Sequence, residues 1–255
     1  MNQNGGRSVK SVDLTCSILR ALRELDGAGV TEIANHVGRS KGAVHNHLST
    51  LHRNELVVKE NDEYKIGLKF LDYGTYAKRR VSGYRSAKEV VRDLAEESGE
   101  VANFMVEEHG VSVYLIKERG DDAVRTASYE GDRKPLHCTA LGKAVLSQFS
   151  KERVEEIIDS RGLPKQTDAT ITERDELFDD LERTRERGYA YDDEEIRSGL
   201  RCVAAPVVDS TGEVQGAVSV SGPISRFKGD RFREELPELV LDAANVIQIN
   251  AAMPD

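Results

Sequence analysis

The chain has 255 residues, of which 38% are hydrophobic, and this length and composition fit a globular protein of two domains. No apolar run approaches the roughly 18 residues that a membrane span needs, so we expect no membrane partner. The first residues, MNQNGGRSVKSVD, lack the apolar core of a secretory signal. The three cysteines Cys16, Cys138 and Cys202 show no CxxC spacing, which favours a reducing cytoplasm over a disulfide framework.

The net charge of −9 is unevenly distributed along the chain. Residues 1–85 carry 14 Lys and Arg against 9 Asp and Glu, whereas the remainder carries 22 against 36. The basic part is therefore suited to contact with DNA phosphates, and the acidic part is expected to have another role. The 23 Arg against 13 Lys in an acidic chain suggest the salt-rich cytoplasm of a halophile.

The chain is expected to begin with a disordered tail over residues 1–10 and a helix over 11–25. A short helix, a tight turn and a second helix are then predicted within residues 31–53. Thr31 is expected to cap the first of these helices and Ser40 the second, with Gly38 at the turn between them. Two such helices also occur as an ordinary antiparallel pair in larger helical domains, and this alternative stays open on this segment alone.

The second helix of the pair has one apolar and one polar face. Val44, Leu48 and Leu51 recur at i, i+4 and i+7 and form the apolar stripe. Asn, Ser and Arg side chains on the other face can bond to base edges or phosphates, and Lys near the helix start can reach a phosphate. The residues predicted to bind DNA are Ser40, Lys41, His45, Asn46, Ser49 and Arg53.

Residues 56–67, LVVKENDEYKIG, are typical of two short strands around a polar turn at Asn61 and Asp62. Two helices followed by a hairpin make a winged helix–turn–helix, so residues 11–67 are predicted to be a DNA-binding domain. Residues 68–85 are predicted to form a connecting helix. Two roles stay open for its basic residues: they contact the phosphates that flank the operator, or they only form the solvent-exposed face of the helix. These residues are Lys78, Arg79, Arg80 and Arg85.

Residues 86–255 are predicted to form an α+β domain with a mostly antiparallel sheet and flanking helices. In the last expected helix before the final strands, Thr172 and Asp175 resemble a capping box and Gly188 a helix stop. The expected helices are 86–99, 139–148, 151–162, 171–188 and 230–252, and the expected strands are 100–110, 111–120, 122–130, 189–192, 201–208 and 214–221.

Three segments of this domain combine turn, small and polar residues as binding pockets do: 135–144, 191–207 and 217–223. Ser219 and Ser221 alternate with Val along one strand, which puts both hydroxyls on one face. If that face is internal, the serines, Cys202 and an acidic side chain line one polar cavity. Serines on a strand also occur merely on its solvated face, and this alternative stays open.

Other chemistry is compatible with these residues. Cys202, His137 and Asp192 form the nucleophile, base and orienting acid of a hydrolase if they meet in space. Cys138 or Cys202 serves as a redox-sensing thiol if its pKa is lowered, although only Arg201 is an obvious basic neighbour. Cys138, Cys202 and His137 together have the ligand types of a zinc site, but adjacent residues on an extended loop point apart. We expect no enzyme activity, no metal and no cofactor.

The chain resembles the IclR family of transcriptional regulators over residues 11–253. The similarity rests on TEIANHVGRSKGAVHNHLSTL, PLHCTALGKA and DDEEIRSGLRCVAAPVVDSTGEVQGAVSVSGP. It implies a winged helix–turn–helix, a connecting helix and a C-terminal effector-binding domain of GAF-like fold. It also implies a homodimer, or a dimer of dimers, on a palindromic operator in double-stranded DNA. The implied effector is a small organic, sugar or aromatic acid.

The resemblance assigns the effector pocket by position. The matching residues are Ala140, Leu141, Asp192, Leu200, Cys202, Ser219 and Ser221. Ala43, Asn46 and His47 depart from the Thr, Arg and Leu usual at their positions, so the operator of a relative is not transferable. The sequence thus predicts a transcription factor whose operator binding is controlled by a small anionic metabolite.

Overall fold

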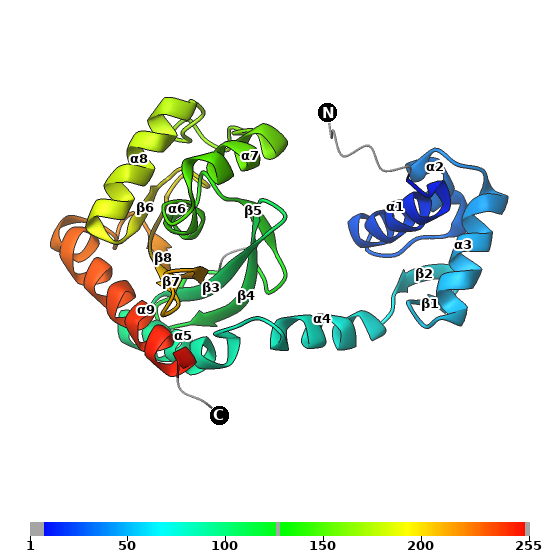
Figure 1. The fold of residues 1–255 in the computed structure, drawn as a ribbon. Helices are drawn as coiled ribbons and strands as arrows, with labels where there is room; N and C mark the ends of the chain where they lie inside the picture. The colour runs from blue at the N-terminus through cyan, green and yellow to red at the C-terminus, as the bar shows by residue number, and fades with distance from the viewer. Residues whose placement is uncertain (1–7, 126–127, 253–255) are drawn as a thin grey trace. The chain divides into compact units, whose positions relative to one another are not determined.

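The computed structural model describes residues 8–125 and 128–252, and the chain forms two compact units, residues 1–80 and 81–255 (Figure 1). Most of the tail expected at residues 1–10 lies outside the described residues, and Lys10 already begins the first helix. Among the described residues, no helix has the length and apolar content needed to cross a membrane.

The first unit is a winged helix–turn–helix, as predicted. Its first three helices pack around an apolar core that includes Ile18, Leu48 and Val57, and an antiparallel hairpin closes it. Asn61 and Asp62 take positive φ at the hairpin turn, as expected of the polar turn in the wing. The elements are α1 (Lys10–Glu24), α2 (Val30–Val37), α3 (Lys41–Arg53), β1 (Val57–Glu60), β2 (Glu63–Ile66) and α4 (Lys69–Arg79).

The turn between α2 and α3 forms as predicted, but α2 begins differently. Gly38 has φ 65°, and the Ser40 hydroxyl accepts the Ala43 N–H at 3.3 Å. The expected cap at Thr31 is wrong, since α2 begins at Val30 after an extended Gly29. The physical reason lies just upstream, where the backbone of residue 28 pairs with that of residue 64 and fixes where the helix can begin.

The connecting segment is not one helix. Helix α4 ends at Arg79, and a new helix, α5, begins at Tyr84 in the second unit. Between them Gly83 has φ 75°, a left-handed conformation that a helix interior does not contain. The backbone therefore breaks at this glycine, two residues before the expected end of the connecting helix.

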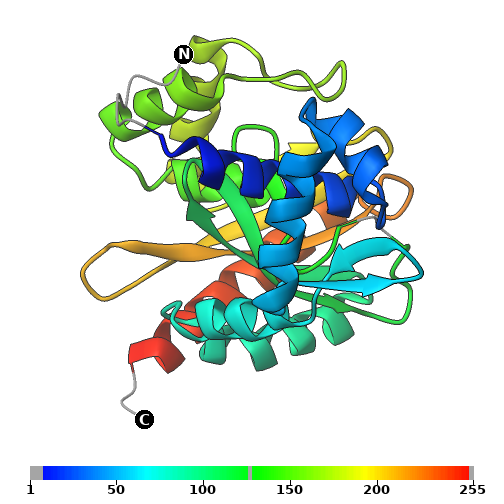
Figure 2. The same cartoon turned by 90° about the vertical axis from the view of Figure 1, so that its right-hand side faces the viewer.

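The second unit is a six-stranded antiparallel sheet in the order β5-β4-β3-β8-β7-β6, with helices on both faces. Figure 2 shows the β7–β8 turn extending from the sheet. Its elements are α5 (Tyr84–Ser98), β3 (Val101–Glu108), β4 (Val111–Arg119), β5 (Arg133–Pro135), α6 (Ala140–Leu146), α7 (Lys151–Arg161), α8 (Arg174–Arg187), β6 (Ala190–Asp193), β7 (Leu200–Val208), β8 (Val214–Pro223), a π-helical turn (Arg231–Glu235) and α9 (Leu236–Ala252).

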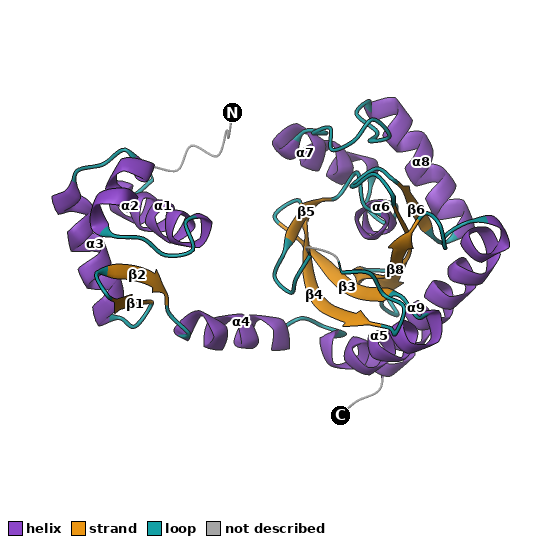
Figure 3. Cartoon of the chain, turned by 180° about the vertical axis from the view of Figure 1, so that it is seen from behind, coloured by secondary structure: helices purple, strands orange, loops and turns teal. Residues whose placement is uncertain are grey.

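The sheet separates two apolar cores, each on its own face. Helices α5 and α9 cover one face, and α6, α7 and α8 cover the other (Figure 3). Because successive side chains point to opposite faces, Phe104 joins the core under α5 and α9, while Met105 joins the core under α6. This architecture confirms the predicted α+β fold with an antiparallel sheet and flanking helices.

Two local predictions in this unit are wrong. The strand expected at 122–130 is absent among the described residues there, and 126–127 lie outside the description. The chain returns to the edge of β4 only at residue 131, whose N–H donates to the Tyr114 carbonyl. Helix α8 begins at Arg174 without a side-chain cap, so no capping box forms at Thr172, although Gly188 ends the helix with φ 83° as expected.

Candidate functional site

The outer face of α3 is open to solvent. Its apolar stripe is buried as predicted, and Val44, Leu48 and Leu51 hold the helix against the rest of the winged helix. The residues predicted to bind DNA are all exposed: Ser40, Lys41, His45, Asn46, Ser49 and Arg53. Within the described parts of the chain, the side chains of Lys41, His45 and Arg53 form no hydrogen bond or ion pair. This face is therefore available to a partner.

The cations of the wing are already paired. Lys59 lies 2.8 Å from Asp62, and Lys65 lies 2.9 Å from Glu60. Each pair is exposed, and water and salt screen it. The positive charges of Lys41 and Arg53 on α3 are therefore less neutralised than those of the wing lysines.

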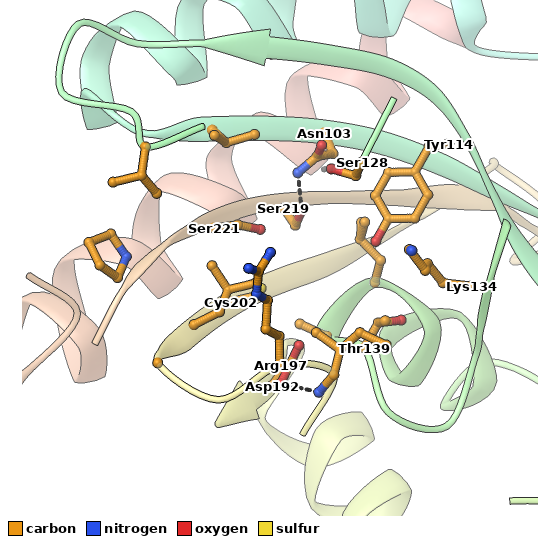
Figure 4. A pocket seen from close by; sticks show the side chains of 18 of the residues that line it. Asn103, Tyr114, Ser128, Lys134, Thr139, Asp192, Arg197, Cys202, Ser219 and Ser221 are labelled. Atoms are coloured by element: carbon orange, nitrogen blue, oxygen red, sulfur yellow. Dashed lines mark hydrogen bonds between the residues drawn. The ribbon is translucent and has the colours of Figure 1, made fainter. Parts of the chain in front are cut away.

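A cavity of about 350 Å³ opens on the sheet of the second unit, on the side of α6. We call it the sheet cavity (Figure 4). All seven residues that the sequence assigned to the effector pocket line it: Ala140, Leu141, Asp192, Leu200, Cys202, Ser219 and Ser221. Segments that are up to 81 positions apart in the sequence therefore meet at one place.

Strand pairing explains how the polar side chains converge. Ser221 stands opposite Cys202 on β7 and Val101 on β3, and Ser219 stands opposite Asn103. The Asn103 side-chain amide donates to the Ser219 hydroxyl at 3.4 Å. The intervening Val220 points into the other core, so the alternation along β8 puts both hydroxyls in the cavity as predicted.

Asp192 is a buried acid at the cavity wall. Its Oδ1 accepts the backbone N–H groups of Glu195 at 2.8 Å and Ile196 at 3.3 Å, and its Oδ2 has no partner among the described residues. Burial, and then the negative charge of Glu195, raise the pKa of Asp192 to about 7. The group can therefore donate or accept a proton near neutral pH.

A buried ion cluster lies behind this wall. The Lys143 ammonium is 2.8 Å from Asp180 and 2.5 Å from Glu195. Burial works to lower the pKa of Lys143, but the two carboxylates outweigh it and the pKa is raised, so Lys143 is charged. Since Glu195 also donates its N–H to Asp192, the cluster fixes the loop that forms one side of the cavity.

Sequence reasoning missed several lining residues. The cations Arg125, Lys134 and Arg197 border the cavity, and in Figure 4 the Arg197 guanidinium points inward. Tyr114 and Asn103 also line it. Arg197 stands in the same segment as Asp192, so its position in the sequence was a usable signal. Lys134 and Tyr114 come from strands whose neighbours in space the sequence does not indicate.

The geometry and the pKa values of the cysteines argue against their roles as a catalytic nucleophile, a redox sensor or a zinc ligand. His137 borders a different cavity, on the side of α7, and does not line the one that contains Cys202. Burial raises the pKa of Cys138 to about 12 and the pKa of Cys202 well above its ordinary value. Both thiols are thereby kept protonated and weakly nucleophilic. Among the described residues, no group of three His, Cys, Asp or Glu side chains is arranged to hold a metal ion.

A winged helix with an exposed recognition face, joined to a domain with an internal polar cavity, defines a DNA-binding transcriptional regulator. Comparison with known proteins identifies which kind. Residues 79–249 match the profile of the bacterial transcriptional regulator IclR C-terminal domain, and residues 11–61 match the IclR helix-turn-helix domain. The chain belongs to the IclR family.

Relatives cover nearly the whole chain. It is 30% identical over 253 residues to the probable HTH-type transcriptional regulator ArcR of Halobacterium salinarum, which spans 97% of this chain and 96% of that protein. The crystal structure of Thermotoga maritima IclR is similar with a TM-score of 0.76 at 26% identity, covering 96% of this chain and 98% of the other. An IclR homologue of Microbacterium hydrocarbonoxydans, solved with 4-hydroxybenzoate, shares the fold with a TM-score of 0.77 at 19% identity, covering 94% and 98%.

Proposed function

We propose that this protein binds an operator through α3 and that a small anionic metabolite in the sheet cavity controls this binding. The observation that carries the proposal is the convergence of Asp192, Cys202, Ser219 and Ser221 on one cavity. Ser40, at the cap of α3, and Lys41, in its first turn, contact phosphates. The α3 residues His45, Asn46, Ser49 and Arg53 face the groove. These side chains are exposed and supply the donors that such contacts need.

The cavity's charges favour a carboxylate effector. The Arg197 side chain forms no hydrogen bond or ion pair within the described parts of the chain, and it points into the cavity. Its planar guanidinium suits two-point recognition of a carboxylate. Ser219 and Ser221 supply hydroxyl donors nearby. The Microbacterium homologue, which was solved with the carboxylate 4-hydroxybenzoate, supports an acid as the ligand class.

The first unit carries a surface suited to self-association. Helix α4 buries none of its residues, and large apolar side chains on and beside it are open to solvent. Leu68 is 85% exposed, Leu71 69% and Tyr76 67%. Such a surface is costly unless it is covered. We infer a homodimer through this half, and a dimer of dimers as a further assembly, on a palindromic operator in the cytoplasm.

An enzymatic role is the weaker alternative. The hydrolase arrangement needs His137 beside Cys202, and His137 lines another cavity. A redox sensor needs a thiolate, and burial keeps the pKa of Cys202 high. We therefore infer a regulator without catalytic activity.

Fluorescence anisotropy tests the proposal on the full chain. The protein is titrated onto a duplex from its own upstream region and onto a scrambled duplex, across a salt series. Each carboxylate of a panel of sugar, keto and aromatic acids is compared with its neutral amide. We expect preference for the upstream duplex and a change in affinity with one carboxylate but not with its amide.

Two variants separate the effector site from the DNA site. Arg197→Gln should abolish the response to the acid while leaving DNA affinity in its absence unchanged. Arg92→Gln, an exposed arginine on α5 that pairs with Asp93, serves as the matched control and should respond like the parent. Equal binding to both duplexes at every salt concentration would refute the operator assignment.

A further inference from the structure

The lining of the sheet cavity carries an excess of positive charge. Arg125, Lys134 and Arg197 line it, and Asp192 is the one acid among the described lining residues. Burial raises the pKa of Asp192 to about 7, so this group carries only part of a negative charge at neutral pH. The cavity is therefore more positive than one carboxylate requires, although the chain after residue 85 has an excess of acidic residues.

Two of these cations come from opposite edges of the sheet. In the strand order β5-β4-β3-β8-β7-β6, Lys134 stands on β5 at one edge. Arg197 stands in the loop that follows β6, the strand at the other edge. Every strand of the sheet contributes a lining residue, so the cavity extends across the sheet. A ligand that meets both cations must therefore carry a negative group near each of its ends.

The strand register turns Lys134 towards the cavity. Lys134 pairs with Ser112 on β4, and Ser112 lies on the same face as Tyr114 because side chains alternate along a strand. Residues that pair across two strands share a face, so Lys134 and Tyr114 point the same way. Figure 4 shows the Lys134 ammonium and the Tyr114 hydroxyl facing the cavity from one side and the Arg197 guanidinium from another.

Tyr114 adds a hydrogen-bond donor beside Lys134. The residue is 9% exposed, and its hydroxyl points into the cavity and forms no hydrogen bond within the described parts of the chain. Burial raises the pKa of the phenol, so the hydroxyl keeps its proton and can donate. A largely buried donor without a partner is costly. An anionic group next to Lys134 would accept this hydrogen bond.

The charge of Lys134 is neutralised only in part. The Asp132 carboxylate lies 3.1 Å from the Lys134 ammonium. The pKa of Lys117 is lowered by burial and by the positive charges of Arg119 and Lys134, while Asp132 opposes this effect. One carboxylate thus acts on two neighbouring ammonium groups. Because an ammonium has three donors, Lys134 can hold an anion in addition to Asp132.

The volume of the cavity sets the size of the ligand. A cavity of roughly 150 Å³ holds benzene, so one of about 350 Å³ holds about 14 non-hydrogen atoms. A six-carbon sugar acid with a second anionic group has about this size. A three-carbon acid with a single carboxylate would leave much of the cavity empty and would meet one cation only.

We propose that the effector is a dianion, a hydroxylated chain of about six carbons that places one anionic group at Arg197 and Ser221 and the other at Lys134 and Tyr114. This inference rests on the proposed function, since it names the ligand class of the same cavity. A carboxylate suits the planar guanidinium, whereas the ammonium suits a carboxylate or a phosphate. Sugar diacids and phosphorylated sugar acids share this chemistry.

Isothermal titration calorimetry on the full chain compares probes that differ at one end. Gluconate and glucarate share a hydroxylated six-carbon chain, but glucarate carries a second carboxylate where gluconate has a hydroxymethyl group. 6-Phosphogluconate carries a phosphate at that end, and galactonate and galactarate repeat the comparison with another hydroxyl configuration. We expect a dianion to bind roughly tenfold more tightly than its matched monoanion, as one hydrogen bond to a charged group requires. The tighter of the two dianion types identifies the second anionic group.

Variants assign the gain in affinity to Lys134. Lys134→Gln should bring the affinity for the dianion down to that of the parent for the monoanion, whereas Lys134→Arg keeps the cation and should retain most of the preference. Tyr114→Phe should weaken binding of the dianion about fivefold, the size of one neutral hydrogen bond. Lys88→Gln, on the exposed side of α5, is the matched control and should bind like the parent. Circular dichroism reports that each variant is folded.

The outcomes separate this inference from the proposed function. Equal affinity for monoanion and dianion in every pair, or a preference unchanged in Lys134→Gln, would overturn the dianion and leave a carboxylate effector at Arg197 in place. Failure of every acid to bind would overturn both. The proposed function fails by itself if an acid binds and the affinity for the upstream duplex stays the same.

Discussion

The carboxyl group of Asp192 shows how burial changes the chemistry of a single residue. It remains protonated up to about pH 7 in the folded chain, while in an unfolded chain it ionises near its ordinary value of 3.8. The folded state therefore retains this proton across that range. The contribution of Asp192 to stability is largest below pH 4 and is lost as the pH rises towards 7.

Asp192→Asn removes this dependence, because an amide oxygen still accepts the N–H groups of Glu195 and Ile196 but carries no charge. We expect the melting temperature of the variant, relative to the parent, to rise between pH 5 and pH 8. Thermal unfolding at several pH values measures this difference. A difference that is constant with pH would mean that the carboxyl is ionised in the folded protein.

Lys143 presents the opposite charge in an equally buried position. Lys143→Met leaves Glu195 buried without a cation and leaves Asp180 with only Arg183, at 3.3 Å, which should cost about 3–5 kcal/mol of unfolding free energy. Urea denaturation measures this loss as the change in the unfolding free energy of the second unit. The triple variant that also changes Asp180→Asn and Glu195→Gln carries no uncompensated charge and should recover much of the stability.

At the scale of elements, α3 was the helix whose apolar periodicity was clearest in the sequence. Its stripe of Val44, Leu48 and Leu51 was predictable because a helix repeats every 3.6 residues, and this local rule needs no knowledge of the fold. Helix starts were less predictable. The start of α2 depends on the pairing of Ala28 with Tyr64, which lies 36 positions away in the sequence.

The lining of the sheet cavity was predictable in part, where a local periodicity in the sequence indicates it. Ser219 and Ser221 were found from alternation along one strand, whereas Lys134 and Tyr114 reach the cavity through the pairing of β4 with its neighbours. The strand expected at 122–130 failed because its β propensity carries no information about where an edge strand finds a partner. Long-range pairing is thus the information that the local pattern lacks.

A test of α3 follows from its exposed cation. Lys41→Gln should weaken binding to all duplexes by a similar factor and lower the slope of log affinity against log salt by about 1, as loss of one phosphate contact requires. Asn46→Ala should instead reduce the preference for the operator over scrambled DNA. Lys88→Gln, an exposed lysine on α5, is the control and should leave the slope unchanged. A salt slope equal to the parent's for Lys41→Gln would exclude this contact.

At the scale of the whole molecule, assembly should decide how tightly the operator is held. Leu71→Glu adds a charge to the exposed apolar surface of α4, where the free chain loses no packing. We expect this variant to sediment as a monomer at concentrations at which the parent is a dimer. Its affinity for a palindromic duplex should fall at least tenfold, while its affinity for a half-site should stay near that of the parent. Dimerisation that persists in the variant would place the interface elsewhere.

The pleat of β8 has a consequence for how new sensors of this type arise. Val218 and Val220 belong to the core that keeps the domain folded, whereas Ser219 and Ser221 line the sheet cavity, where we propose that the effector binds. Mutations at the odd-numbered positions can therefore change what the protein detects with little effect on whether it folds. Directed evolution of a biosensor should randomise these two serines together with Cys202, and leave the valines between them untouched.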